Sequence, residues 1–196
     1  MLGIILAGGK GRRMGGDKPQ RELAGRPLIA WVIDALMPQV DQLMISGDHK
    51  QLEPFNLPLL GDAAHLKGPA AGLISALNQA RNIGAKGLLV VPCDMPFLPQ
   101  TLGRDLAGGG VQVPQVAGDV PIWSISCWSQ TALQQSPDLA AFSTQGKNPS
   151  LRAILAAYGA TAKRFEKSMP FFGVNTRAAL EQAHAHVRRR AVEAAP

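Results

Sequence analysis

The sequence predicts an α/β fold, a class in which helices cover both faces of a largely parallel sheet. Three short apolar segments, residues 2–6, 43–45 and 88–91, have the composition of strands that are buried on both faces. Between them lie segments with helical periodicity, at a spacing typical of parallel strands joined by helices. The 196 residues are 46% apolar, so we expect one domain with one core over residues 1–196.

The first half of the chain has the clearest pattern. Residues 2–6 form an apolar, β-branched strand that glycines end. Pro27 stands where a helix begins, and apolar residues at helical spacing continue to Leu36 before Pro38 stops the helix. A strand at 43–45, a helix that begins near Gly68-Pro69 and a strand at 88–91 follow.

Beyond Pro99 the pattern is weaker, and the expected elements are short. We expect helices over 102–106, 129–135, 150–157 and from Thr176 to about Arg190, and strands over 111–116, 121–127 and 160–165.

The composition excludes several classes of protein. The apolar runs are far shorter than the roughly 20 residues of a membrane-spanning helix, and the first one precedes its positive charges, unlike a secretory signal. The two cysteines, Cys93 and Cys127, form neither a disulfide framework nor a zinc motif. We therefore expect a cytoplasmic protein with no membrane partner.

The net charge of +6 is concentrated near the N-terminus. Six basic and two acidic residues lie in the first 26 positions, so four of the six net positive charges are there. Only 5% of residues are aromatic and no nucleic-acid-binding motif is present, so we expect no nucleic-acid partner. The Arg188-Arg189-Arg190 run keeps a nucleic-acid-binding module as an alternative.

A glycine-rich, basic segment follows the first strand. Five of the nine residues from Gly8 to Gly16 are glycine, and cations that include Arg13 and Lys18 lie between and after them. Glycine N–H groups can approach an anion closely, and cations neutralise its charge. The segment matches neither a Walker A motif nor the dinucleotide fingerprint. Because ligands of open α/β sheets bind beyond the carboxyl ends of strands, it is a candidate polyphosphate site.

Asp94 comes directly after the strand at 88–91 and its Pro92-Cys93 extension. It should emerge beside the glycine-rich segment. A single carboxylate there suits Mg²⁺, which takes its other ligands from water and phosphates. The alternative is that Asp94 caps the next helix.

Five motifs together resemble the molybdenum cofactor guanylyltransferases of the nucleotidyltransferase superfamily. They occur in the family's order and at its spacing: LAGGKGRRMGGDK at 6–18, LAGRPL at 23–28, GPAAG at 68–72, PCDMPFLP at 92–99 and GVNT at 173–176. The resemblance implies a single Rossmann-like, three-layer domain of the nucleotide-diphospho-sugar transferase type. It also implies a Mg²⁺-dependent transfer of GMP from GTP to the phosphate of molybdopterin cofactor, with release of pyrophosphate. Other cofactor-biosynthesis proteins or recipient molybdoenzymes are implied as further partners.

The same resemblance implies the site residues. Arg13, Lys18 and Asp94 would be catalytic, and Asp94 and Asn175 would hold the metal, although the Asn-Thr pair is also a good helix start. The implied nucleotide-binding residues come from the ends of several strands and are Leu6, Ala7, Gly8, Gly9, Lys18, Ser46, Asp62 and Asp94. The sequence departs from the family at Ser46 and Gly173, where relatives often carry Asn.

The residues 6–9 favour GTP as the donor. Guanylyl-transferring members resemble Leu-Ala-Gly-Gly, whereas cytidylyl-transferring members tend to have Leu-Ala-Ala-Gly, and a glycine leaves room for a larger base. The alternatives are a related nucleotidyltransferase that uses CTP or another phosphorylated acceptor, and a nucleotide-binding protein without turnover. Trp123 and Trp128 are expected either in the core or in the acceptor pocket.

Overall fold

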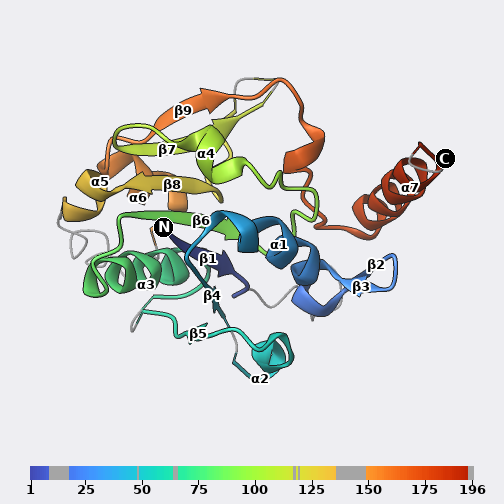
Figure 1. Cartoon of the computed structure of the whole chain (residues 1–196), viewed down its shortest axis with the longest axis horizontal. Helices are drawn as coiled ribbons and strands as arrows, with labels where there is room; N and C mark the ends of the chain where they lie inside the picture. The colour runs from blue at the N-terminus through green and yellow to red at the C-terminus, as the bar shows by residue number, and fades with distance from the viewer. Residues whose placement is uncertain are drawn as a thin grey trace.

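The computed structural model describes residues 1–8, 18–47, 49–63, 66–116, 118, 120–135 and 149–193, without the side chains of Lys18 and His49. Within these residues, seven strands form one sheet in the order β5-β4-β1-β6-β8-β7-β9 (Figure 1). All neighbours pair in parallel except β8, which runs antiparallel to β6 and β7. The strands are β1 (Leu2–Leu6), β4 (Gln42–Ser46), β5 (Leu59–Leu60), β6 (Gly87–Pro92), β7 (Val111–Gln115), β8 (Ser126–Ser129) and β9 (Thr161–Arg164).

Helices cover both faces of this sheet, which gives three layers (Figure 1). One face packs against α1 (Leu28–Leu36), α2 (His49–Leu52) and α4 (Leu102–Leu106). The other packs against α3 (Pro69–Asn82), α5 (Gln130–Gln134) and α6 (Leu151–Ala157). The α/β class predicted from the sequence is confirmed.

The central strand β1 explains why the apolar runs have no polar interruption. All five of its residues are buried. Ile4 packs in the core on the α3 side, whereas Ile5 packs in the core on the α1 side. Since a strand directs alternate side chains to opposite faces, a strand covered on both faces must be apolar throughout.

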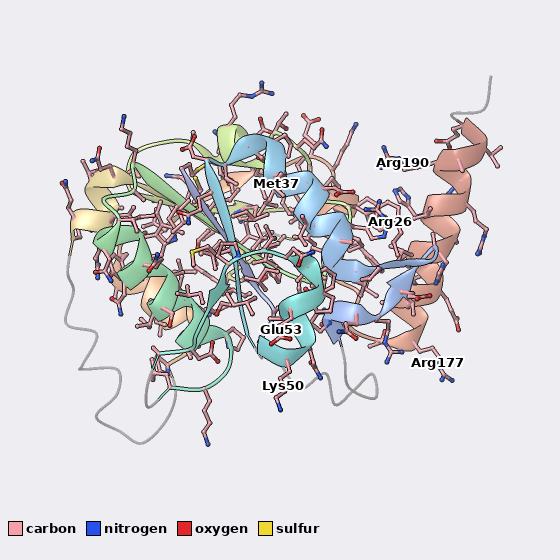
Figure 2. All side chains as sticks on the ribbon, turned by 60° about the horizontal axis from the view of Figure 1, so that its bottom comes forward. Arg26, Met37, Lys50, Glu53, Arg177 and Arg190 are labelled. Carbon is pink, nitrogen blue, oxygen red and sulfur yellow. The ribbon has the colours of Figure 1, made fainter. Side chains whose placement is uncertain are left out.

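The C-terminal helix α7 (Arg177–Glu193) packs outside the three layers. Ala183 of α7 is buried in a separate small core with Leu23 and Leu28, beside the hairpin of β2 (Glu22–Leu23) and β3 (Arg26–Pro27). Figure 2 shows Arg177 and Arg190 near its two ends, and the residues 188–190 are exposed. None of the described helices has the length and apolar character required to cross a bilayer.

Two predictions made from the sequence are wrong in extent. The strand expected at 121–127 is β8, which begins only at Ser126, because Pro121 has no N–H and forms just an isolated bridge with Gln115. Ser129 ends this strand and caps α5 with its hydroxyl, instead of lying inside the helix. In addition, residues 22–27, for which the sequence predicted neither strand nor helix, form the β2–β3 hairpin.

Arg81 of α3 ties this helix to α5 and α6. Its Nε donates to the Leu133 carbonyl at 2.7 Å and its Nη2 donates to the Tyr158 hydroxyl at 2.8 Å. We expect Arg81→Met to lower the free energy of unfolding by about 1–3 kcal/mol, because hydrogen bonds from a charged group are lost and their acceptors remain. Urea unfolding measures the change. Arg104→Met is the control, because the Arg104 side chain is 79% exposed, and an equal loss in both variants would contradict the role of Arg81.

Burial raises the pKa of the Cys127 thiol to about 11. The folded protein therefore keeps this thiol protonated at pH 8. As the pH rises further toward about 11, ionisation of the thiol increasingly favours the unfolded chain. We expect iodoacetamide to modify Cys127 at pH 8 roughly two orders of magnitude more slowly in the native protein than in urea. Peptide mapping by mass spectrometry measures both rates. Equal rates would show that the thiol is not shielded.

Candidate functional site

The carboxyl ends of three neighbouring strands lie at the same level at one edge of the sheet. Leu6 of β1 pairs with Ser46 of β4 and with Pro92 of β6. The ladder continues one step further, because the Ala7 N–H donates to the Ser46 carbonyl at 2.6 Å and the Cys93 N–H donates to the Leu6 carbonyl at 3.1 Å. Ligands of open α/β sheets bind beyond such ends, which makes this edge the candidate site.

A cavity of about 270 Å³ lies at this edge. Its walls combine the segments that follow β1 and β6 with the turn that precedes α7, and they include Leu6, Ala7, Gly8, Asp94, Ser124 and Asn175. Four of the residues predicted to bind the nucleotide therefore meet one another and the predicted second metal ligand. A larger hollow of about 600 Å³ lies at Met1 and Gly87, near the amino ends of β1 and β6, and contains none of the predicted site residues.

Asp94 links the end of β6 to the turn before α7. It is 4% exposed, and its backbone carbonyl accepts a hydrogen bond from the Val174 N–H at 2.8 Å. This bond brings the neighbouring Asn175 to the cavity that Asp94 lines. Two residues that are distant in the sequence, one with a carboxylate and one with an amide side chain, thus line the same cavity.

Thr176 serves as the start of α7, which was the alternative role for Asn175. The Thr176 hydroxyl accepts a hydrogen bond from the Ala179 N–H at 3.1 Å, the geometry of a helix cap. Gly173 leaves space for the amide of Asn175, because a Cβ on Gly173 would lie 2.8 Å from Asn175 Nδ2. The departure from the family at Gly173 therefore accommodates the neighbouring side chain.

Gly8, Ser46 and Asp62 form a second cluster at the ends of β1 and β4. Ser46 is 1% exposed, and its hydroxyl donates to Asp62 Oδ1 at 3.2 Å. The Asp62 carboxylate lies beside Gly8, since a Cβ on Gly8 would be 3.7 Å from Asp62 Oδ2. Three of the predicted nucleotide-binding residues are thus neighbours, although they come from separate parts of the chain.

Sequence reasoning missed Gly47, which this cluster requires. A Cβ on Gly47 would lie 2.8 Å from the Ala7 carbonyl carbon and 2.9 Å from the Gly8 backbone nitrogen. Only glycine lets the chain after β4 pass this close to the chain after β1. A glycine two residues after the strand predicted at 43–45 was the available signal.

Some predicted residues lie outside the part of the chain that the structure describes. They are Gly9, Arg13 and the side chain of Lys18, whose backbone begins a short 3-10 turn at Lys18–Gln20. Their roles stay predictions.

The two tryptophans of the second half have different environments. Trp128 is 1% exposed in the core, and its Nε1–H donates to Ser126 Oγ at 2.9 Å. Trp123 is half-buried next to Ser124, and the guanidinium carbon of Arg152 lies 5.9 Å from its ring centre. Trp128 is therefore a core residue, and Trp123 packs against the same core, next to Ser124 of the cavity wall.

Among the residues that the structure describes, no three His, Cys, Asp or Glu side chains gather in a metal-binding group. Mg²⁺ needs no such group, because it binds through one or two protein oxygens and keeps waters or phosphates as its other ligands. Asp94 and Asn175 both carry hard oxygen donors and line one cavity, so their chemistry fits this ion.

Comparisons with known proteins show the family of this chain. A family model described as the MobA-like NTP transferase domain matches residues 3–194. A molybdenum cofactor guanylyltransferase of Cereibacter sphaeroides is 36% identical over 97% of this chain and 99% of its own length. One of Acidiphilium cryptum is 34% identical over 93% of each chain.

A solved structure extends the likeness to the fold. The molybdopterin-guanine dinucleotide biosynthesis protein A of Archaeoglobus fulgidus superimposes with a TM-score of 0.75 at 25% identity, over 96% of this chain and 100% of that one. The fold is that of the nucleotide-diphospho-sugar transferases. The chain belongs to the MobA-like nucleotidyltransferases, in the family of the molybdenum cofactor guanylyltransferases.

Proposed function

We propose that this protein transfers the GMP group of GTP to the terminal phosphate of molybdopterin cofactor and releases pyrophosphate. The observation that carries the proposal is the cavity beyond β1 and β6, which Gly8, Asp94 and Asn175 line together. Relatives that match nearly the whole chain are named for this activity. The product is the guanine dinucleotide form of the cofactor.

Small residues at the end of β1 would bind the nucleotide. Leu6, Ala7 and Gly8 border the cavity, and the absence of large side chains at Ala7 and Gly8 lets a ligand approach the backbone. We assign Gly9 to the same backbone surface. We assign Arg13 and Lys18 to the phosphates, where fixed cations stabilise the charge that develops on the departing pyrophosphate.

Asp94 and Asn175 would hold Mg²⁺. The bound ion would neutralise phosphate charge and orient the triphosphate. The burial of Asp94 and the hydrogen bond from Val174 to its backbone carbonyl hold this residue at the wall of the cavity. The acceptor phosphate is already ionised at neutral pH, so the chain's task is to align it with the nucleotide, without a general base.

We expect the purified protein, incubated with GTP, Mg²⁺ and molybdopterin cofactor, to form the guanine dinucleotide product and an equal amount of pyrophosphate. Chromatography of the product and an enzymatic pyrophosphate assay measure the two yields. With CTP the rate is expected to be lower, because Gly8 provides room for a purine. Faster cytidylyl transfer would reject GTP as the donor. No pyrophosphate with any phosphorylated acceptor would indicate a nucleotide-binding protein without turnover.

We expect Asp94→Asn to lower kcat/KM by about 100-fold or more, since a neutral amide is a poor substitute for a charged ligand of Mg²⁺. Binding of GTP without metal is expected to change by less than about threefold, because the substitution preserves the side-chain shape. Steady-state kinetics and calorimetry measure the two effects.

The matched control is Asp34→Asn. Asp34 pairs with Arg26 at 2.6 Å on the surface, where an ion pair contributes little, so activity should remain near that of the wild type. Near-normal activity of Asp94→Asn would reject the metal role.

A further inference from the structure

Two residues of the cavity wall differ in how burial holds them. Asp94 is buried, whereas Asn175 is exposed, so burial of its own side chain does not keep Asn175 at the cavity. Its neighbour Val174 is fully buried and donates its N–H to the Asp94 carbonyl at 2.8 Å. The place of Asn175 therefore depends on what holds Val174.

The side chain of Val174 lies in the small core beside α7, which is separate from the two cores that flank the sheet. In this α7 core Val174 is grouped with Leu23, Leu28 and Ala183, and all four are fully buried. Leu28 begins α1, and the Leu23 carbonyl accepts a hydrogen bond from Trp31 Nε1–H of the same helix at 3.2 Å. The α7 core thus connects the turn at the cavity to a helix that packs on the sheet.

Ala183 is the contact of α7 with this core. Among the residues 177–193 of the helix it is the buried one, while Leu180 and Val187, about one turn away on either side, are partly buried. Figure 1 shows α7 beside the β2–β3 hairpin, apart from the helices that cover the sheet. A polar substitution at Ala183 should therefore loosen α7 without opening the cores of the three layers.

We propose that Ala183 and Val174 are positioning residues for the metal site. Packing of α7 on Ala183 keeps Val174 in the α7 core, and Val174 in turn keeps Asn175 beside Asp94. The inference rests on the proposed function, because it concerns the Mg²⁺ site assigned to Asp94 and Asn175. It gives a role to a helix that lies outside the three layers.

Conformational entropy supplies the physical reason. A second metal ligand strengthens binding most when its backbone is ordered before the ion arrives, since ordering it afterwards reduces the binding free energy. The buried Val174 orders the backbone next to Asn175 in the protein without ligand. Loss of α7 packing should therefore weaken metal binding about as much as removal of the Asn175 amide.

The test compares Ala183→Asp with the matched control Ala185→Asp. Ala185 is exposed on the same helix, so the two variants share the lower helix propensity and the added charge, and differ in burial. Calorimetry measures the affinity for GTP with and without Mg²⁺, and the ratio of the two affinities is the metal effect. Hydrogen exchange with mass spectrometry follows the amides of residues 172–176 and, as an internal reference, those of β1.

We expect Mg²⁺ to raise the GTP affinity of the wild type, and Ala183→Asp to reduce this metal effect about tenfold, as is usual when a group that orients a metal ligand is lost. The affinity without Mg²⁺ should stay unchanged. Exchange should become faster over residues 172–176 and remain slow in β1, which would show that the three layers are intact. Ala185→Asp should match the wild type in every measurement.

A double-mutant cycle tests whether Ala183 acts through Asn175. Asn175→Ala should reduce the metal effect by a similar factor, and adding Ala183→Asp to it should cause no further loss. Val174→Ala is the milder variant, in case Ala183→Asp does not fold, because it truncates one buried side chain and leaves α7 unaltered. It should reduce the metal effect in the same direction and by a smaller factor.

Four outcomes would overturn the proposal. They are a wild type whose GTP affinity does not respond to Mg²⁺, faster exchange over residues 172–176 with an unchanged metal effect, a further loss from Ala183→Asp in the absence of the Asn175 amide, and equal losses in Ala183→Asp and Ala185→Asp. Calorimetry and hydrogen exchange need no turnover. A protein that shows the expected metal effects and transfers no GMP would therefore reject the proposed function alone.

Discussion

The parallel pairing of β1 with β4 and with β6 determines where the chemistry can take place. The three strands end at the level of Leu6, Ser46 and Pro92, and backbone hydrogen bonds continue the alignment to Ala7 and Cys93. Since both faces of these strands are buried, a slip of one residue would move every side chain to the opposite core. The positions of Gly8 and Asp94 are therefore fixed by the core.

Close approach of the backbone is the second requirement of the site. Gly47 lets the chain after β4 pass against Ala7 and Gly8, and Gly72 lets α3 reach the hydroxyl of Ser46. Neither glycine supplies a functional group. Each lacks a side chain that would keep the neighbouring segments apart, so the charged and polar groups of the site can lie close together.

The fold was predictable where burial dictates composition. Strands such as β1 and β6 must be apolar on both faces, and their limits were close to those predicted. The antiparallel strand β8 was harder, because residues 121–125 alternate in polarity like a strand, yet a turn closed by the Ile125 N–H and the Ile122 carbonyl occupies part of this segment. The β2–β3 hairpin was missed because its turn contains Ala24 in the left-handed region, at φ 51°, where glycine or asparagine would be the usual signal.

The site was predictable to the extent that it lies in motifs next to strands. The meeting of Asp94 with Asn175 follows from a hydrogen bond between backbone atoms, which no sequence pattern reveals. The contact of Ser46 with Asp62 depends likewise on how a loop returns to the end of β4. Ser124 lines the cavity because of how the chain folds, and no local sequence pattern marks this residue.

The outermost strand β9 has a consequence for how molecules of this protein meet in solution. Among the strands that the structure describes it pairs only with β7, and all four of its residues are exposed, including Lys163 and Arg164. A strand from a second molecule that paired with β9 would have to displace water from the two adjacent cations, and the cations would stay close together despite their mutual repulsion. The positive charge of β9 thus disfavours pairing of this strand with strands of other molecules when the protein is concentrated.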